Sequence, residues 1–457
     1  MRHVLMIAHV FPPFFSVGGS IRAVKFAKYL PECGWQPHVL TIDDRVETTS
    51  QRRQGSAELL AELPPNTPIH RTPSGEPPAS LQAKGRAARD RSRVAAVVVN
   101  VLSRLRRWVY RYVLIPDANI TWLPAAVRAG RRIVREAGIE AIWVTCPPHS
   151  AALIGALLKR LTHRPLIVDY RDDWIDTPWF RAKPRAVQWL ERRLERWIVG
   201  TADRVVLVTP ASHTAFVARY PQRPLQTFNL IPNGCDLAEF TAAQTIEVGA
   251  HATFNIVHAG LLTVDRGWHR SPAGFFAALR QIAQEQPDMA AQMKVTFTGQ
   301  LPEAYRQIVA AHRLSGLVHE AGFLPREQLL RTLREADLLL TINYEDFSTL
   351  IPGKLYEYWA IGRAPILLLD GQGAAQQFVE QYALGQCVRP DDVAGIAAAI
   401  QTAYRQRAAG TPLTIDARGV EQYDRRALTH RLATVLDTIT AQGEQTWHTN
   451  WLAGWRL

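Results

Sequence analysis

The chain has 457 residues, which is too long for one ordinary hydrophobic core and indicates two domains. Its hydrophobic fraction of 47% is that of a globular protein and excludes extended disorder. The four cysteines stand far apart without C-x-x-C spacing, which excludes a disulfide framework and fits a reducing cytosol. No run approaches the ~20 apolar residues that cross a bilayer, and the N-terminus begins with a strand pattern instead of a signal peptide. A cytoplasmic protein is therefore expected, either soluble or peripheral on the inner face of the cell membrane.

The net charge of +12 has a local source between residues 84 and 112, where nine cations stand against Asp90 alone. An apolar run, Val94 to Val99, lies among these cations, and three aromatic residues follow it. This composition is typical of a helix on an anionic membrane surface, which is the partner that we expect here. A solvated helix that packs on its own domain remains the alternative. Nucleic acid could use the same charges but ranks last, and no nucleic-acid partner is expected.

The first half of the chain alternates strand and helix patterns. Apolar runs bounded by glycine, proline or polar residues predict strands, and amphipathic runs of ten or more residues predict helices. The predicted strands are 4–10, 38–42, a short one near 69, 141–145, 166–170 and 204–209, and the predicted helices are 20–33, 125–137, 149–161 and 186–199. This alternation predicts a parallel sheet with helices on both faces.

A break follows at Asn233-Gly234-Cys235-Asp236, and after a polar segment the second half repeats the scheme. Its predicted strands are 255–258, 294–298, 317–321, 337–343, 364–369 and 386–388, with helices between them. We expect an N-terminal domain over 1–240 with an insert at about 84–115, a C-terminal domain over 252–430 and a helical, aromatic tail over 431–457. The predicted class is α/β with two doubly wound parallel sheets, and ligands of such folds bind at the carboxyl ends of the strands.

The strand predicted at 337–343 leads through a polar turn into a helix that begins near Pro352 and ends at Gly362. Such a loop places the free N–H groups and the positive dipole end of a helix at the carboxyl edge of the sheet, where phosphate binds well. Lys354 stands in the first turn of this helix, and Glu357 stands about one turn further, within reach of sugar hydroxyls. The pattern predicts a nucleotide-sugar site. The alternative is that Glu357 is a solvated helix residue beside Lys354.

Three groups in the first half also follow predicted strands. Gly18 and Gly19 open a helix and allow a backbone to approach a ligand, and Arg22 adds a charge one turn later. A tight turn without a ligand is the alternative there. His149 begins a helix and is either a catalytic residue or a packing residue. Asp172 belongs to an ionic cluster that either binds substrate hydroxyls or forms a self-satisfied Arg–Asp network.

Arg266 and Arg270 lie in the loop after the strand at 255–258. A pyrophosphate leaving group needs cations as its bond breaks, and a preorganised arginine supplies one. An exposed loop arginine is the alternative at both positions. No group of histidines, cysteines or carboxylates has metal-ligand spacing, so we expect no metal and no other cofactor.

In this order and spacing, these residues resemble the GT-B glycosyltransferases, in particular the large retaining group called family 4. The resemblance covers nearly the whole chain and implies two Rossmann-like domains facing a central cleft. It also implies metal-independent transfer from a nucleotide-diphosphate sugar that the C-terminal domain mainly binds. The matching motifs are Phe11-Pro12-Pro13, Gly18-Gly19, Arg22, Asp169-Tyr170-Arg171-Asp172, Asn233-Gly234-Cys235-Asp236, Ala259-Gly260, Thr298-Gly299, Gly322-Phe323-Leu324-Pro325 and Pro352-Gly353-Lys354-Leu355-Tyr356-Glu357-Tyr358.

The resemblance implies a role for several single residues. By it, Glu357 binds the nucleotide ribose, Gly19 and Arg266 face the diphosphate, and His149 lies near the reacting sugar. The candidate catalytic residues are His149, Arg266 and Asp172, and the candidate nucleotide-sugar-binding residues are Gly18, Gly19, Arg22, Arg270, Thr349, Lys354, Leu355 and Glu357.

Two positions depart from the family pattern. Thr349 stands where the first of two spaced glutamates usually touches the donor sugar, which leaves the identity of that sugar open. Leu261 stands where a basic residue often follows Ala259-Gly260, and Arg266 or Arg270 would have to compensate.

The expected function is transfer of a sugar from a nucleotide donor to a hydroxyl of a cell-envelope polysaccharide or lipid-linked precursor. Retention of configuration is implied by the family alone. Two alternatives remain open. A GT-B nucleotide-sugar epimerase would use the same site without an acceptor, and a non-catalytic nucleotide-sugar or glycan-binding protein would explain Thr349 and Leu261 as lost chemistry.

Overall fold

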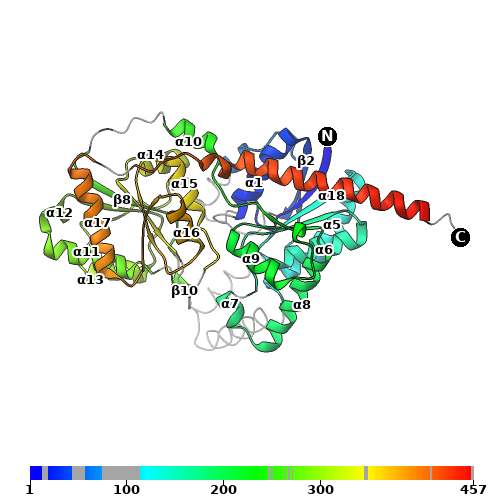
Figure 1. Cartoon of the computed structure of the whole chain (residues 1–457), viewed down its shortest axis with the longest axis horizontal. Coiled ribbons are helices and arrows are strands. Elements are labelled where there is room, and N and C mark those ends of the chain that lie inside the picture. Colours follow the sequence, from blue (N-terminus) through cyan, green and yellow to red (C-terminus); the bar gives the residue numbers. More distant parts are fainter. Residues whose placement is uncertain are drawn as a thin grey trace, which may run out of the picture. The chain divides into compact units, whose positions relative to one another are not determined.

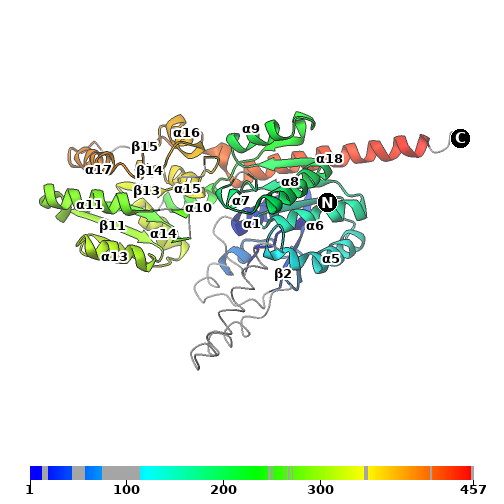
Figure 2. The ribbon, with the colours of Figure 1, turned by 90° about the horizontal axis from the view of Figure 1, so that it is seen from below.

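The computed structural model describes residues 1–12, 19–43, 57–74, 114–175, 177–244, 249, 251–262, 264–265, 268–269, 271–343, 348–411 and 414–453. The chain forms two compact units, which Figures 1 and 2 show in two views. Unit 1 comprises Met1–Val208, Ser212–Pro232 and Leu428–Leu457, and unit 2 comprises Thr209–Ala211 and Asn233–Ala427. The main division therefore follows Pro232, and the segment Leu428–Leu457 is part of unit 1.

Unit 1 contains a parallel sheet of seven strands in the order β3-β2-β1-β4-β5-β6-β7. The strands are β1 (Arg2–Ile7), β2 (Trp35–Ile42), β3 (Ile69–Thr72), β4 (Ala141–Cys146), β5 (Leu166–Tyr170), β6 (Arg204–Leu207) and β7 (Phe228–Leu230). The helices are α1 (Gly19–Tyr29), α5 (Leu123–Glu136), α6 (His149–Thr162), α7 (Pro178–Arg181), α8 (Arg185–Thr201), α9 (Pro210–Arg219) and α18 (Arg425–Ala453), with 3-10 turns η1 (Leu30–Cys33), η2 (Ala118–Trp122) and η3 (Leu225–Thr227). The strand order runs outward from β1 in both directions, which makes the sheet doubly wound.

Both faces of this sheet are covered by helices. Successive strand residues point to opposite faces, so the same strands contribute to two separate clusters of buried side chains. One cluster includes α5, α6, α8 and α9. The other includes α1 and, from α18, Leu428, Leu432 and Leu436. Figure 1 shows α18 lying along α1.

Unit 2 contains a parallel sheet of six strands in the order β12-β11-β8-β13-β14-β15 and a separate antiparallel pair, β9 and β10. The strands are β8 (Phe254–Ala259), β9 (Val264–Asp265), β10 (Trp268–His269), β11 (Met293–Thr298), β12 (Val318–Glu320), β13 (Leu338–Ile342), β14 (Ile366–Leu369) and β15 (Gly385–Val388). The helices are α10 (Leu237–Gln244), α11 (Ala273–Glu285), α12 (Pro287–Ala291), α13 (Glu303–Ala311), α14 (Arg326–Arg334), α15 (Gly353–Ile361), α16 (Ala374–Gln381) and α17 (Val393–Ala408), with the 3-10 turn η4 (Val420–Tyr423). Helices α11, α13 and α17 cover one face of the sheet, and α14, α15 and α16 cover the other.

The two parallel sheets confirm the predicted α/β class with two doubly wound, Rossmann-like domains. The strands predicted at 166–170 and near 69 form as β5 and β3. The pair β9–β10 was missed, because strands of two residues are too short to show an alternating pattern. The predicted membrane segment at 84–112 lies outside the described residues. Among the described helices, none combines the length and the apolar character that crossing a membrane requires.

Helix α15 is fixed at both ends by residues that the sequence placed close to its boundaries. Pro352 is the residue before the helix, with φ −59° and ψ 133°, and not its first residue as predicted. Gly362 ends the helix in the left-handed region with φ 65°, where a side chain would be strained. These ends set where the first turn of α15 meets the carboxyl edge of the sheet in unit 2.

Candidate functional site

In unit 2, the first turn of α15 brings a cation to the carboxyl end of β8. Lys354 Nζ lies 3.2 Å from His258 Nε2, and a Cβ added to Gly260 would lie 3.6 Å from the same Nζ. Gly260 has φ 102°, and a Cβ on Gly299 would lie only 2.7 Å from the Gly260 carbonyl oxygen. The two glycines therefore let the loops after β8 and β11 approach each other beside the ammonium group. A cation beside the N–H groups of a helix start is a suitable site for a phosphate.

His258 determines how Lys354 is held. The imidazole is fully buried, and its Nδ1 lies 3.0 Å from the Leu340 carbonyl oxygen. Because a carbonyl oxygen only accepts, Nδ1 carries the proton and Nε2 accepts a hydrogen bond from the Lys354 ammonium. Tyr358 holds the backbone of the same two strands, β8 and β13. Its hydroxyl accepts a hydrogen bond from the Ala259 N–H at 2.8 Å and donates one to the Leu340 carbonyl oxygen at 3.3 Å. The end of β8 is thus joined to α15 by a buried hydrogen bond from Ala259 to Tyr358 and a partly buried one from Lys354 to His258.

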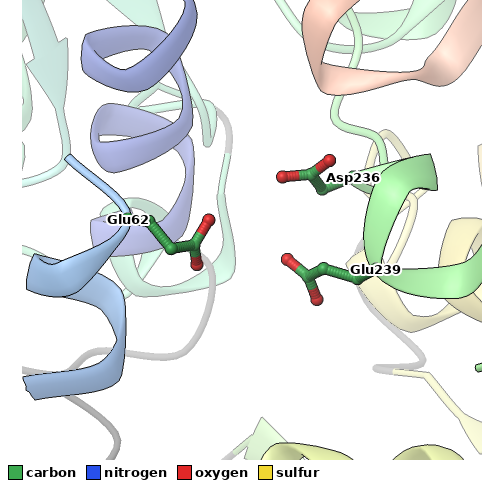
Figure 3. A group of neighbouring side chains, drawn as sticks. All are labelled: Glu62, Asp236 and Glu239. Atoms are coloured by element: carbon green, nitrogen blue, oxygen red, sulfur yellow. The ribbon is translucent and has the colours of Figure 1, made fainter. Parts of the chain in front are cut away.

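Glu357 lies one turn after Lys354 and is held by a chain of ionic contacts. Arg326 Nη1 donates to Glu357 Oε2 at 3.3 Å, and Arg326 Nε donates to Glu239 Oε2 at 2.8 Å. Figure 3 shows Glu239 and Asp236 projecting from the start of α10. The Glu357 side chain is 23% exposed, and no described residue donates to its second oxygen, Oε1. The carboxylate is therefore oriented on one side and open to a hydroxyl on the other.

Two further predicted donor-binding residues hold the backbone around α15. The Thr349 carbonyl oxygen accepts a hydrogen bond from Thr209 Oγ1 at 2.8 Å. The Leu355 side chain is fully buried in an apolar cluster, and the Leu355 N–H donates to the Pro352 carbonyl oxygen at 3.0 Å. The structure thus gives Leu355 a packing role in the first turn of α15, with neither its side chain nor its N–H turned to solvent.

The same edge of the sheet holds a polar pair that was not among the predicted site residues. Asn343 and Asp370 directly follow the neighbouring strands β13 and β14, and both are buried. Among the described residues, the two amide atoms of Asn343 and Oδ2 of Asp370 have no hydrogen-bond partner of normal geometry. Burial raises the pKa of the Asp370 carboxyl. Their position at strand ends was the one available sequence signal. Because the Asn343 side chain lies against the Asp370 carboxyl and acts to lower its pKa, the pair does not by itself mark a ligand site.

In unit 1, the start of α1 lies against the guanidinium of Arg171. A Cβ on Gly19, the first residue of α1, would lie 2.2 Å from Arg171 Nη1 and 2.9 Å from its Cζ. Arg171 Nη2 donates to the Pro147 carbonyl oxygen, and its buried Nε has no partner among the described residues. Gly19 is thus needed to leave room for a cation at a helix N-terminus, which is a second arrangement suited to an anion.

Arg22 has a different place from the one that the sequence predicted. Its side chain and that of Asp169 are both 0% exposed, and Arg22 Nε and Nη2 donate to the two Asp169 oxygens at 2.9 Å. Arg22 also donates to the carbonyl oxygens of Pro232 at 2.8 Å and Ile231 at 2.9 Å, and Asp169 Oδ2 accepts from Thr145 Oγ1 at 3.0 Å. The guanidinium is enclosed in the protein. Its hydrogen bonds join α1 to β5 and to the segment after β7. Direct contact of Arg22 with a donor does not agree with this burial.

His149 is the first residue of α6 and lies in an aromatic stack. It is 8% exposed, its ring lies 4.7 Å from the Trp174 ring centroid with an interplanar angle of 5°, and no described group bonds to its buried Nδ1. Burial, reinforced by the charges of Lys183 and Arg171, lowers the pKa of His149 to about 3. The imidazole is therefore neutral at physiological pH, and it can hydrogen-bond a ligand but is a weak proton acceptor.

The lowered pKa of His149 predicts a specific loss of stability in acid. Below pH 6.5 the unfolded chain binds a proton at this residue while the folded protein does not, so the free energy of unfolding falls as the pH drops from 6.5 toward 3. His149→Phe keeps an aromatic ring against Trp174 and removes this titration. Between pH 7.5 and pH 5.0, wild type should lose about 2 kcal/mol more than the variant, measured by urea unfolding at both pH values. Equal losses would show that His149 is not held neutral.

The other predicted site residues divide into two groups. Asp172 follows β5, is half-buried and makes contacts within the protein. Gly18, Arg266 and Arg270 lie outside the described residues. In the same part of the sequence, Asp265 of β9 pairs with Trp268 of β10.

Comparison with known proteins agrees with this architecture. Residues 17–234 match the family described as a glycosyl transferase 4-like domain. The chain therefore has the GT-B fold, and its residues 17–234 are similar to a glycosyl transferase 4-like domain. Among solved structures, it is similar over 99% of its length to all of sucrose-phosphate synthase from Thermosynechococcus elongatus, with a TM-score of 0.56 and 17% identity.

Two other solved structures show the same GT-B fold. The Anabaena protein Alr3699/HepE in complex with UDP and glucose matches 96% of this chain over all of its own, with a TM-score of 0.59 and 14% identity. UDP-GlcNAc 2-epimerase from Methanocaldococcus jannaschii also matches 96% of this chain over all of its own, with a TM-score of 0.55 and 9% identity. Among curated protein sequences, none matches the chain. These likenesses support the fold, and the chemistry has to be argued from the residues above.

Proposed function

We propose that this GT-B protein transfers a sugar from a nucleoside-diphosphate sugar to a hydroxyl of a cell-envelope polysaccharide or lipid-linked precursor. The observation that carries the proposal is the placement of Lys354 beside Gly260 at the start of α15, with Glu357 one turn further along the helix. This spacing suits a diphosphate followed by a ribose. The Anabaena relative, which was solved with UDP and glucose, supports a nucleotide-sugar donor.

The donor is proposed to bind through the start of α15. The diphosphate accepts hydrogen bonds from the helix N–H groups and from Lys354, and Glu357 Oε1 accepts from the ribose hydroxyls. Arg266 and Arg270 belong to the connection between β8 and α11 and would add charge to the diphosphate, which is the role proposed for them in place of the basic residue missing at Leu261.

The proposed reaction is a displacement with retention at the anomeric carbon. The bond from this carbon to the diphosphate oxygen breaks with its electron pair going to the diphosphate, the acceptor oxygen bonds to the carbon on the same face, and the acceptor proton passes to the departing phosphate oxygen. Negative charge therefore grows on the diphosphate, where the Lys354 ammonium stabilises it without a metal ion. His149 is proposed to hydrogen-bond the reacting sugar, because its lowered pKa disfavours proton transfer.

The start of α1 is proposed as an anion site within unit 1, where Gly19 leaves room for the Arg171 guanidinium at the helix N-terminus. Gly18 is proposed to contribute to the same turn, and Asp172 to bind a hydroxyl. Arg22 is assigned to holding this region in place, because its guanidinium is bonded to Asp169 and to two carbonyl oxygens.

The test is turnover of a panel of donors. UDP, GDP, ADP and dTDP sugars are incubated with the protein, with EDTA present throughout, and with or without a lipid and glycan extract of cell envelopes. We expect release of one nucleoside diphosphate that depends on the extract and is lost in Glu357→Gln. An isomeric nucleotide sugar formed without extract would establish the epimerase alternative. The likeness in fold to UDP-GlcNAc 2-epimerase is the reason to measure this product. Binding of a donor without any product would show a non-catalytic protein.

A further inference from the structure

The outward face of α8 in unit 1 has an unusual distribution of charge. The two glutamates of the helix, Glu191 and Glu195, are fully buried. Glu191 accepts from Lys183 and from Trp174 Nε1 at 3.2 Å, and Glu195 accepts from Arg219 at 3.2 Å and Tyr220. The arginines of the helix are all exposed, and no ion pair joins them to a described carboxylate; they are Arg185, Arg192, Arg193 and Arg196. The helix therefore turns its acids inward and its cations outward.

Large apolar side chains lie in the middle of these arginines. Trp189 is 61% exposed and Leu190 is 37% exposed. Residues 185, 189, 193 and 196 recur at helical spacing, so Trp189 lies on one stripe with three arginines. The Arg193 guanidinium lies 4.9 Å from the Trp189 ring centroid.

Helix α7 is a neighbour of α8 in unit 1. Trp179 is 37% exposed, and Figure 1 shows α7 beside α8. The two helices are held together in part by Arg192, whose guanidinium lies 5.2 Å from the Phe180 ring centroid. We call a group of exposed residues of α8, namely Arg185, Trp189, Leu190, Arg193 and Arg196, the α8 face.

We propose that the α8 face is a docking surface for an anionic phospholipid bilayer. Tryptophan and leucine on a helix rich in arginine are the composition of an element that lies in the interface between lipid headgroups and acyl chains. Each arginine near an anionic surface adds roughly fivefold to the partition coefficient, and no exposed carboxylate of α8 opposes this attraction. The inference stands on these described residues and does not depend on the transferase reaction, although a bilayer is where a lipid-linked acceptor would be met.

A bilayer fits this surface better than a nucleic acid does. Leu190 has no role in contacting phosphates or bases, but its exposure is explained if it enters the acyl region of a membrane.

The test measures sedimentation of the full chain with vesicles. Wild type should bind vesicles of phosphatidylcholine with 30% phosphatidylglycerol and not vesicles of phosphatidylcholine alone, at about 0.1 M salt where charges up to ~10 Å apart still attract. The triple variant Arg185→Gln, Arg193→Gln and Arg196→Gln should bind roughly 100-fold more weakly. Trp189→Ser should weaken binding while leaving its salt dependence unchanged.

The matched control removes the same charge elsewhere on unit 1. Arg131, Arg132 and Arg135 are exposed on α5, and their change to Gln should leave vesicle binding within about threefold of wild type. Equal losses in the two triple variants, or no loss in either, would overturn the proposal. Binding of an oligonucleotide that the α8 variant abolishes, without vesicle binding, would assign the face to nucleic acid instead. Donor turnover is measured in parallel in detergent-free buffer. A failure of the proposed sugar transfer is then distinguished from a failure of vesicle binding.

Discussion

If Lys354 has the proposed role, Lys354→Met is expected to lower kcat for sugar transfer by about 100- to 1000-fold, because it removes the cation proposed to stabilise the departing diphosphate. The variant also leaves the buried His258 Nε2 without its donor, which costs about 1–3 kcal/mol of stability. Unfolding should therefore be measured together with turnover, at a temperature where the variant remains folded. Lys354→Arg restores the charge, and we expect it to recover part of the activity.

The matched control for this prediction is Lys294→Met. Lys294 is exposed on β11 in the same unit, so the same side-chain change should leave kcat and stability near the wild-type values. A folded Lys354→Met variant with turnover within about threefold of wild type would contradict the assignment of Lys354 to the leaving group.

Arg22→Met is expected to destabilise unit 1 by about 3–5 kcal/mol, because it leaves the Asp169 carboxylate buried without its charge partner. For a unit of this size, such a loss lowers the melting temperature by roughly 6–20 °C. The carbonyl oxygens of Ile231 and Pro232 lose their donor in the same variant. Thermal unfolding followed by calorimetry measures the effect and separates the transitions of the two units if they unfold independently.

Two further variants separate the effect of breaking the buried ion pair from the general effect of removing an arginine. Adding Asp169→Leu to Arg22→Met removes the uncompensated charge and should recover part of the stability. Arg132→Met breaks only an exposed pair with Glu136, whose side chains are 63% and 60% exposed, and should cost less than about 1 kcal/mol. Equal effects of Arg22→Met and Arg132→Met would show that the Arg22–Asp169 pair does not hold the fold together.

The sequence predicted the fold well because buried strands of parallel sheets are continuous apolar runs. β5 and β13 are such runs, and both formed at or within one residue of their predicted ends. The glycine at 362 predicted the end of α15 because only glycine takes the left-handed conformation there without strain. Short elements such as β9 and β10 carry no comparable pattern.

The site was predicted less completely, because its contacts join residues far apart in the sequence. Lys354 was predicted from its position in the first turn of α15, but its partner His258 stands 96 residues earlier in what reads as an ordinary strand. Arg22 looked like a ligand residue because it follows two glycines, whereas Asp169, its partner 147 residues later, decides its role. In the sequence, Arg171 stood out only as part of an ionic cluster. Its contact with Gly19 could not be predicted, because it arises only when the chain folds.

The central claim is that the start of α15 binds a nucleoside diphosphate, and thermal unfolding with UDP, GDP, ADP, dTDP and CMP tests it most directly. Ligand at ~100 times its dissociation constant should add about 2.7 kcal/mol to the free energy of unfolding. We predict a rise in melting temperature for one diphosphate, unchanged by EDTA, lost in Glu357→Gln and kept in Glu327→Gln, an exposed glutamate of α14 in the same unit. No shift with any nucleotide, or an equal shift in wild type and Glu357→Gln, would contradict the account.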